Sequence, residues 1–379
     1  MSQPQPQPQP QEYDPRGIEY YTVPTLTFTS GTTLHDVKVA YRRFNPDSTA
    51  GTILIPTCYG GFINTTLTLT GPAPNDALSK YHVVVVAMLG NGESSSHSNK
   101  AFFPEPGELR YQDVVRAQHQ LLTEHLKITR LVAVMGFSMG GQQAYHWGVM
   151  YPDFVSRVIA ICSSARTSAH NYAFLEGPIA ALTNSIDYIA WRAMKAKVAR
   201  GEEVGQNMKD VVPRNGIRAF ARTYAAWLTS AAWFRDREWS KGPFAGFNSL
   251  DDWMRAREDG YMIWDAQDLL VLARMWQLGD IGDAIPGEEA TGIKPLGYKI
   301  PEDASYAKAL KSIEAKVLLL PCRTDQYFPP QDSEIEAKYL QNGRVEVIES
   351  TWGHVAGGGL NPDDTAFLNE RIGRFLSEE

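Results

Sequence analysis

The sequence predicts an α/β fold in which a mostly parallel central sheet is flanked by helices and interrupted by a helical cap insertion. Continuous apolar runs, such as VVVVA at 83–87 and LVAVM at 131–135, are typical of strands buried on both faces. Helical patterns alternate with these runs, and β-α-β connections give parallel neighbours. Between residues 167 and 306 only helical stretches occur. We therefore expect a core of residues 17–166 and 307–379, with 167–306 as the cap.

The individual elements follow from local patterns along the chain. Alternation of apolar residues between 22 and 41 predicts an antiparallel hairpin. The other elements expected before the cap are a strand over 52–56, a short helix over 74–79, an amphipathic helix over 111–126, a helix over 141–150 and a strand over 155–162. After the cap we expect a strand over 315–320, a helix over 332–340, a strand over 345–349 and a final helix over 365–376.

The composition excludes several classes of function. The chain has 379 residues and a net charge of −7, which argues against nucleic-acid binding, because phosphate contacts need Lys and Arg. No apolar run of about 18 residues occurs, so no membrane span is expected. The Gln/Pro-rich leader over 1–16 does not resemble a signal peptide and is expected to be disordered. Three separated cysteines without a CxxC motif favour a reducing, cytoplasmic location.

The motif GFSMG at 136–140 fits the pattern G-x-S-x-G, with a buried strand before it and a helical pattern after it. A serine on such a tight strand-to-helix turn projects its hydroxyl above the edge of the sheet. Glycines on both sides remove Cβ atoms that would collide there. The following helix also directs its positive end at the site. We therefore predict that Ser138 is a nucleophile.

A serine nucleophile needs a base, and the base needs an orienting carboxylate. In this arrangement the chain order is serine, then an acid, then histidine. Asp325 follows the strand expected over 315–320, and His354 is the one histidine that comes after the cap. Asp332 is a rival carboxylate, but it has the pattern of a helix N-terminal residue. The sequence thus predicts a triad of Ser138, Asp325 and His354.

An oxyanion hole needs two backbone N–H groups. One is expected from Met139, directly after the nucleophile. The other is expected from the CYGG loop after the strand over 52–56, with Tyr59 as the best candidate. Gly60 and Gly61 are candidate substrate contacts, and the alternative is that they form a plain turn.

Arg166 and Asn171 lie just beyond a strand end, near the start of the cap, where ligands bind in open α/β sheets. They are candidate substrate-binding residues. Arg166 suits a substrate carboxylate, and the alternative is a structural salt bridge. No metal motif occurs, so no metal is expected. The cap tryptophans and methionines are expected either to line an acyl tunnel or, for the most part, to form the cap core (Trp191, Met194, Trp227, Trp233, Met254, Trp264, Met275 and Trp276).

Several strings together resemble the homoserine O-acetyltransferase-like branch of the α/β-hydrolase superfamily, over roughly residues 20–378. They are PTCYGG, LGNGESSS, GFSMGGQQAYHWGVMYPDFV, ICSSARTSAHN, TDQYFPP and WGHVAGGG. The resemblance implies an α/β-hydrolase fold, a Ser-His-Asp ping-pong enzyme, a helical cap over the serine and often a homodimer through the cap. It places the triad on the same Ser138, Asp325 and His354. The chain departs from that branch at Phe137 and in the TCYGG loop, which weakens homoserine and acetyl-CoA as substrates.

The sequence therefore predicts a serine hydrolase that acts on a small ester or related acyl substrate through an acyl-enzyme. The alternative is an O-acyltransferase that takes acetyl-CoA or another acyl-CoA as co-substrate, in which cap geometry excludes water. A binding module built on a hydrolase fold is a third possibility, but that usually follows loss of a triad member, and none is lost here. No prosthetic group, nucleic acid or membrane partner is expected, and a homodimer through the cap is the expected assembly.

Overall fold

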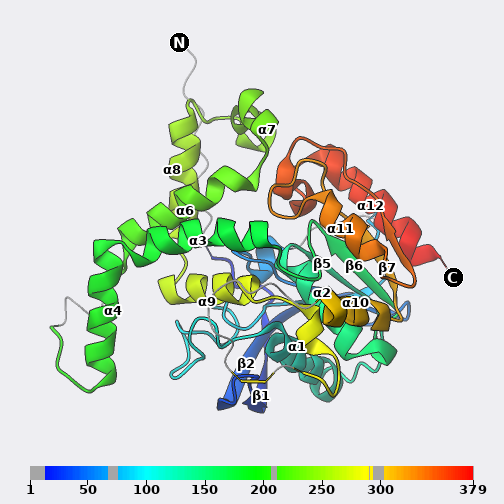
Figure 1. The fold of residues 1–379 in the computed structure, drawn as a ribbon, viewed down its shortest axis with the longest axis horizontal. Helices are drawn as coiled ribbons and strands as arrows, with labels where there is room; N and C mark the ends of the chain where they lie inside the picture. Colours follow the sequence, from blue (N-terminus) through cyan, green and yellow to red (C-terminus); the bar gives the residue numbers. More distant parts are fainter. Residues whose placement is uncertain (1–12, 67–75, 206–210, 290, 293–302, 379) are drawn as a thin grey trace.

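The computed structural model describes residues 13–66, 76–205, 211–289, 291–292 and 303–378. Its centre is a sheet of eight strands in the order β1-β2-β4-β3-β5-β6-β7-β8 (Figure 1). The strands are β1 Glu19–Thr27, β2 Thr33–Phe44, β3 Thr52–Pro56, β4 His82–Val86, β5 Leu131–Phe137, β6 Arg157–Ile161, β7 Lys316–Leu320 and β8 Gly343–Val345. The pairs β1–β2 and β2–β4 are antiparallel, and the pairs from β4 to β8 are parallel, so the predicted mostly parallel sheet is confirmed.

The central strands are buried on both faces because their apolar residues alternate between two core clusters. Leu54, Val84 and Val134 face one cluster, whereas Ile53 and Val83 face the other. Each fully buried side chain of this size contributes about 1.5–3 kcal/mol to folding. This explains why the strand sequences have continuous apolar runs instead of apolar–polar alternation.

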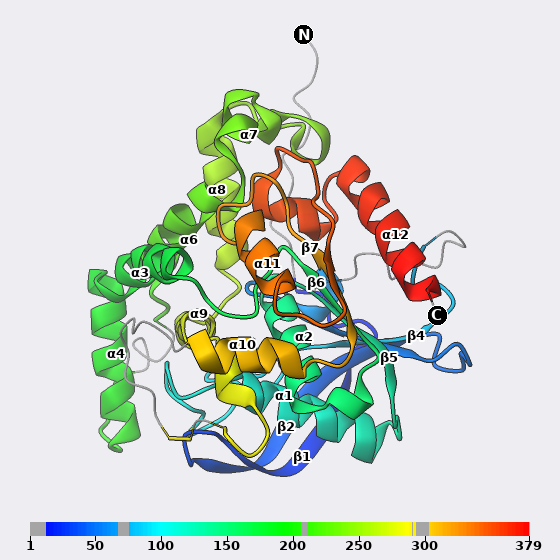
Figure 2. The same cartoon turned by 45° about the vertical axis from the view of Figure 1, so that its right-hand side comes forward.

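Helices cover both faces of the sheet (Figure 2). Side chains of α1 (Tyr111–Gln120), α2 (Met139–Met150) and α10 (Asp303–Ser312) enter the first core cluster. Those of α12 (Pro362–Ser377) enter the second, on the opposite face. The helix α11 (Pro330–Ala337) follows β7, and its Ala337 packs against the first cluster. The helix α2 begins directly at the end of β5, which places the G-x-S-x-G turn above the centre of the sheet.

The described residues between β6 and β7 form helices and connecting turns, apart from a single bridge between Arg166 and Asp280. The helices of this segment before α10 are α3 Ala169–Thr183, α4 Ile186–Ala199, α6 Arg214–Leu228, α7 Ala231–Arg235, α8 Leu250–Tyr261 and α9 Ala266–Gln277. The helices α3, α4, α6, α7 and α8 extend beyond the sheet, while α9 runs close to the core (Figures 1 and 2). We call residues 167–306 the cap. Its exact limits stay a prediction, and α10 already begins at Asp303, inside the expected range.

Three predicted elements are wrong in part. A strand was expected over 345–349, but the observed strand β8 covers Gly343–Val345. Ile348 then forms a single bridge to Cys322, because the chain turns toward His354. The expected helix over 74–79 begins outside the described residues, and its described part forms turns, since the amide of Ala77 donates to Asn369 of α12.

The helix expected over 111–126 changes to a wider π-helical turn at Leu121–His125, where the hydroxyl of Thr123 donates to the carbonyl of His119. The predicted leader over 1–16 lies outside the described residues as far as residue 12. Its last residues are placed against the folded chain, because the Tyr13 ring packs on Phe62 at 5.3 Å between centroids. Among the described residues, no helix is long and apolar enough to cross a membrane.

Candidate active site

Ser138 occupies the sharp turn between β5 and α2, with φ 57° and ψ −127°. This backbone conformation is costly for a non-glycine residue, on the order of 1–3 kcal/mol, and persists only where its surroundings enforce it. The Ser138 N–H donates to the carbonyl of Ile161 at 2.9 Å. Its carbonyl accepts from Gly141 N at 2.9 Å and from the Ser163 hydroxyl at 2.7 Å. The turn is thus fixed from the neighbouring strand β6 and from the helix that it starts.

The glycines of the motif are required by close backbone approach. A Cβ on Gly136 would overlap the backbone of Gly140 and Gly141. A Cβ on Gly140 would lie 2.6 Å from the carbonyl oxygen of Pro56, at the end of β3. The start of α2 therefore packs directly against the loop that follows β3.

Replacing Gly136 with alanine is expected to lower the free energy of unfolding by about 3 kcal/mol, because the overlapping atoms are backbone and cannot rotate away. Urea unfolding followed by circular dichroism measures this change. The matched control is Gly260→Ala on α8, where no atom lies within 4 Å of the added Cβ, so stability should stay the same or rise slightly. Equal stability of the two variants would contradict this account of the turn.

The structure brings together the three residues that the sequence singled out. His354 Nε2 lies 2.9 Å from Ser138 Oγ, and His354 Nδ1 lies 2.8 Å from Asp325 Oδ2. The other oxygen of Asp325 accepts from the backbone N–H groups of Tyr327 at 2.7 Å and Phe328 at 3.1 Å. All three side chains are buried, with 2–5% exposed surface. Asp332, the rival carboxylate, lies at the start of α11.

Three aromatic rings enclose the imidazole of His354. The ring centroids of Phe137, Tyr327 and Phe328 lie 4.7, 4.8 and 5.5 Å from it. These residues were not predicted as part of the site, although they directly neighbour Ser138 and Asp325 in the chain. Packing on three sides limits the orientations that the imidazole can adopt.

The loop that carries His354 is tied to the cap at the junction of α6 and α7. A Cβ on Gly353 would lie 2.8 Å from the backbone of Thr229, so the two chains touch there. The Ser230 hydroxyl donates to the carbonyl of Thr351, and the Gln326 amide donates to the carbonyl of Thr229. The α6–α7 junction of the cap therefore contacts both the histidine loop and the loop that carries Asp325.

The geometry around Tyr59 and Met139 suits an oxyanion hole. Met139 is the first residue of α2, so its N–H has no acceptor within the helix. The Tyr59 hydroxyl donates to the carbonyl of Leu269 at 3.0 Å, and its ring stacks on Tyr224, which fixes the loop. The sequence analysis missed Glu93, whose carboxylate accepts from Ile63 N at 2.8 Å.

Burial raises the pKa of Glu93 to about 7. The Glu93 carboxylate accepts the hydrogen bond from Ile63 N and so holds the loop after β3 in place.

Of the two glycines after Tyr59, Gly61 forms the turn, since its N–H donates to the Cys58 carbonyl at 3.1 Å. Gly60 has φ 64° and lines a pocket. The plain-turn alternative is therefore supported for Gly61, while Gly60 stays a candidate substrate contact.

The other two predicted substrate contacts have structural partners. The Arg166 guanidinium pairs with Asp303 at 3.0 Å and lies 4.1 Å from the centroid of the Tyr306 ring, on α10. This favours the salt-bridge alternative for Arg166. Asn171 is fully buried and donates to the carbonyl of Tyr327 at 2.6 Å, which braces the loop that carries Asp325.

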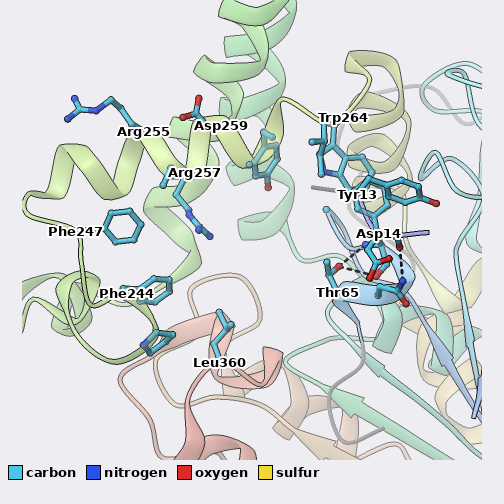
Figure 3. Close-up of a pocket in the computed structure, with 18 of the residues that line it drawn as sticks. Tyr13, Asp14, Thr65, Phe244, Phe247, Arg255, Arg257, Asp259, Trp264 and Leu360 are labelled. Carbon is cyan, nitrogen blue, oxygen red and sulfur yellow. Dashed lines mark hydrogen bonds between the residues drawn. The ribbon is translucent and has the colours of Figure 1, made fainter. Parts of the chain in front are cut away.

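A pocket of about 820 Å³ lies beside the oxyanion loop, between that loop and α8 (Figure 3). Gly60 lines it from the oxyanion loop, Tyr261 from α8 and Leu360 from the loop after His354. Of the cap tryptophans and methionines, Trp264 also lines it, whereas most belong to the apolar clusters (Trp191, Met194, Trp233, Met275 and Trp276). In the described part of the chain, no group of three or more His, Cys, Asp or Glu residues is arranged to hold a metal.

Comparison with known proteins agrees with this architecture. Residues 52–183 match the profile of the alpha/beta hydrolase fold. An ethyl acetate hydrolase of Pseudomonas veronii is 32% identical over 86% of this chain and 85% of its own length. A homoserine O-acetyltransferase of Pasteurella multocida is 26% identical over 96% of this chain and 98% of its own. The structure of the acetyl esterase MekB superposes with a TM-score of 0.76 at 29% identity, covering 95% of this chain and 97% of its own.

These relatives are esterases and acetyltransferases that match this chain over most of its length. The chain is an enzyme, and it belongs to the α/β-hydrolase family.

Proposed function

We propose that the protein is a serine hydrolase that cleaves small esters through an acyl-enzyme on Ser138. The observation that carries this proposal is the hydrogen-bonded chain from Ser138 through His354 to Asp325, at the strand-to-helix turn. In such a chain the histidine takes the serine proton, and the carboxylate holds the imidazole in the required tautomer.

The reaction follows in two halves. Ser138 Oγ attacks the acyl carbonyl carbon while its proton passes to His354 Nε2. The tetrahedral intermediate breaks its bond to the alcohol oxygen, and His354 returns the proton to the leaving alcohol. A water molecule then gives a proton to His354 and attacks the acyl-enzyme, so that release of the carboxylic acid restores the Ser138 hydroxyl.

The negative charge of each tetrahedral intermediate needs two donors. We assign them to the backbone N–H groups of Met139 and Tyr59, at the start of α2 and in the loop after β3. The contact between Gly140 and Pro56 brings these two segments together and supports the assignment. A preorganised pair of donors in a buried site stabilises such an intermediate more than water does.

The alternative is transfer of the acyl group from an acyl-CoA to a hydroxyl acceptor, with the same acyl-enzyme. Hydrolysis is favoured by Phe137, which departs from the glycine of the acetyltransferase branch and packs on His354. It is also favoured by the 32% identity with an ethyl acetate hydrolase, against 26% with a homoserine O-acetyltransferase. A small acyl substrate, a cytoplasmic location and a homodimer through the cap complete the proposal.

Intact-protein mass spectrometry distinguishes the two reactions. Mixing with a short activated ester is expected to give a transient acyl adduct that water removes, and acetyl-CoA is expected to give none. Ser138→Ala serves as the control and should give no adduct. A stable adduct from acetyl-CoA that disappears only after addition of an alcohol or amino-acid acceptor would establish the transferase instead.

A further inference from the structure

One arginine in the pocket beside the oxyanion loop has no acidic partner. Arg257 extends from α8 into the space bordered by Phe244, Leu360 and Thr65 (Figure 3). Its Nε is buried and has no hydrogen-bond partner among the described residues. Arg257 also forms no ion pair with the described residues, whereas Arg255, the other arginine of α8, pairs with Asp252 at 2.6 Å.

The carboxylates that line the same pocket are already neutralised by other arginines. Asp14 pairs with Arg16 at 2.8 Å, and Asp252 pairs with Arg255. Asp259 lies 3.6 Å from Arg218. The cation of Arg257 therefore has no internal counterion in this pocket, although the pocket contains acidic groups.

A partly buried cation without a counterion is costly, because part of its water shell is lost without replacement. The Trp253 and Phe244 rings offset part of this cost, at 5.7 and 6.0 Å from the guanidinium carbon to the ring centroids. The remaining burial still lowers the pKa of Arg257. A guanidinium held in this way is ready to bind an anionic group that enters the pocket.

The pocket also connects Arg257 to the proposed site of reaction. Tyr261 lies one helical turn after Arg257, so the two side chains leave the same face of α8. The Tyr261 hydroxyl lies 3.6 Å from the position of a Cβ on Gly60, next to the proposed oxyanion donor Tyr59. The pocket that Arg257 lines therefore reaches Gly60, one residue after the proposed oxyanion donor Tyr59.

We propose that Arg257 binds a carboxylate on the substrate, so that the enzyme acts on small esters that carry a free carboxylate away from the bond that is cleaved. This inference rests on the proposed esterase function of Ser138. Because Arg255 and Arg218 already balance Asp252 and Asp259, the described residues of the pocket leave Arg257 to balance a single negative charge, which fits a carboxylate better than a doubly charged phosphate. The planar guanidinium also matches a carboxylate with two parallel hydrogen bonds.

The test compares pairs of esters in which a carboxylate replaces a terminal methyl group. Acetoxyacetate is compared with ethyl acetate, and monoethyl succinate with ethyl butyrate, which places the carboxylate on the alcohol side or on the acyl side. Arg257→Gln is expected to lower kcat/KM for at least one anionic ester by about 10- to 100-fold while the neutral esters change by less than about twofold. Arg257→Lys should retain part of the activity on that anionic ester.

The matched control is Arg235→Gln, which removes an exposed arginine of α7 that pairs with Asp236 and should change neither class of ester. An equal loss on neutral and anionic esters would assign Arg257 a purely structural role on Trp253 and Phe244. No loss on any ester would also overturn the proposal.

Calorimetric binding separates this inference from the proposed function. Ser138→Ala is expected to bind the preferred anionic ester, and the double variant Ser138→Ala with Arg257→Gln is expected to lose that binding. If no ester is hydrolysed in a Ser138-dependent way, the esterase proposal fails, yet the binding measurement still reports on Arg257. If esters are hydrolysed but Arg257→Gln changes neither binding nor kcat/KM, only the inference about the carboxylate fails.

Discussion

Ser138→Ala is expected to lower kcat for ester hydrolysis by about 10⁴- to 10⁶-fold, since the variant lacks the oxygen that forms the acyl-enzyme. The hydroxyl lies 2.9 Å from His354 Nε2, and both groups are buried, so bulk water does not easily replace it. The residual rate should come from water activated by His354 next to the oxyanion donors. Hydrolysis of a chromogenic acetate ester measures this loss, with enough variant enzyme that its rate exceeds the rate from contaminating esterases.

Ser164→Ala is the matched control for this experiment. Ser164 is also buried, and its hydroxyl donates to the carbonyl of Arg166 at 2.8 Å, away from His354. We expect this variant to keep kcat within a few fold. Circular dichroism and urea unfolding should show that both variants are folded. Full activity of a folded Ser138→Ala protein would rule out the nucleophile assigned here.

The second large effect is expected for Asp325→Asn, which should reduce kcat by about 10³- to 10⁴-fold. Asp325 Oδ1 accepts from two backbone N–H groups, so the asparagine oxygen is expected to keep that position. The asparagine amide then faces His354 Nδ1 as a donor. The imidazole proton then moves to Nε2. A protonated Nε2 can no longer accept the proton of Ser138. Steady-state kinetics on the same ester measures the loss.

Asp332→Asn tests the rival carboxylate and serves as the control. Burial raises the pKa of Asp332, and its Oδ2 has no hydrogen-bond partner in the described structure, so removal of the charge carries little cost. We expect nearly unchanged kcat. If Asp332→Asn lost activity and Asp325→Asn kept it, the acid of the triad would have to be reassigned to Asp332.

The sequence was most informative where a local pattern has one structural solution. The apolar runs around Ser138 permit only a strand and a helix, and the chain order of acid and base restricted the choice to Asp325 and His354. The contact between His354 and Ser138 spans 216 positions, yet it was predictable because both residues follow strands of one parallel sheet. Parallel strands bring their carboxyl ends to the same edge.

Other features depend on contacts between segments that carry no periodic signal. Nothing in LGNGES indicates that Glu93 bonds to the oxyanion loop, and nothing in DDWMRARED separates Arg257 from Arg255. Arg166 was open to two interpretations because its partner Asp303 comes from a helix far along the chain. Such pairings follow from tertiary packing of distant segments, which composition and spacing do not specify.

The shared contact between the cap and the histidine loop restricts how a substrate enters. Thr229 and Ser230 touch the segment of Thr351 and Gly353, so a rigid swing of α6 and α7 would pull the base away from the nucleophile. Any movement of the cap that admits substrate would therefore have to leave this contact in place. A change at the α6–α7 junction is expected to displace His354 and so to lower kcat.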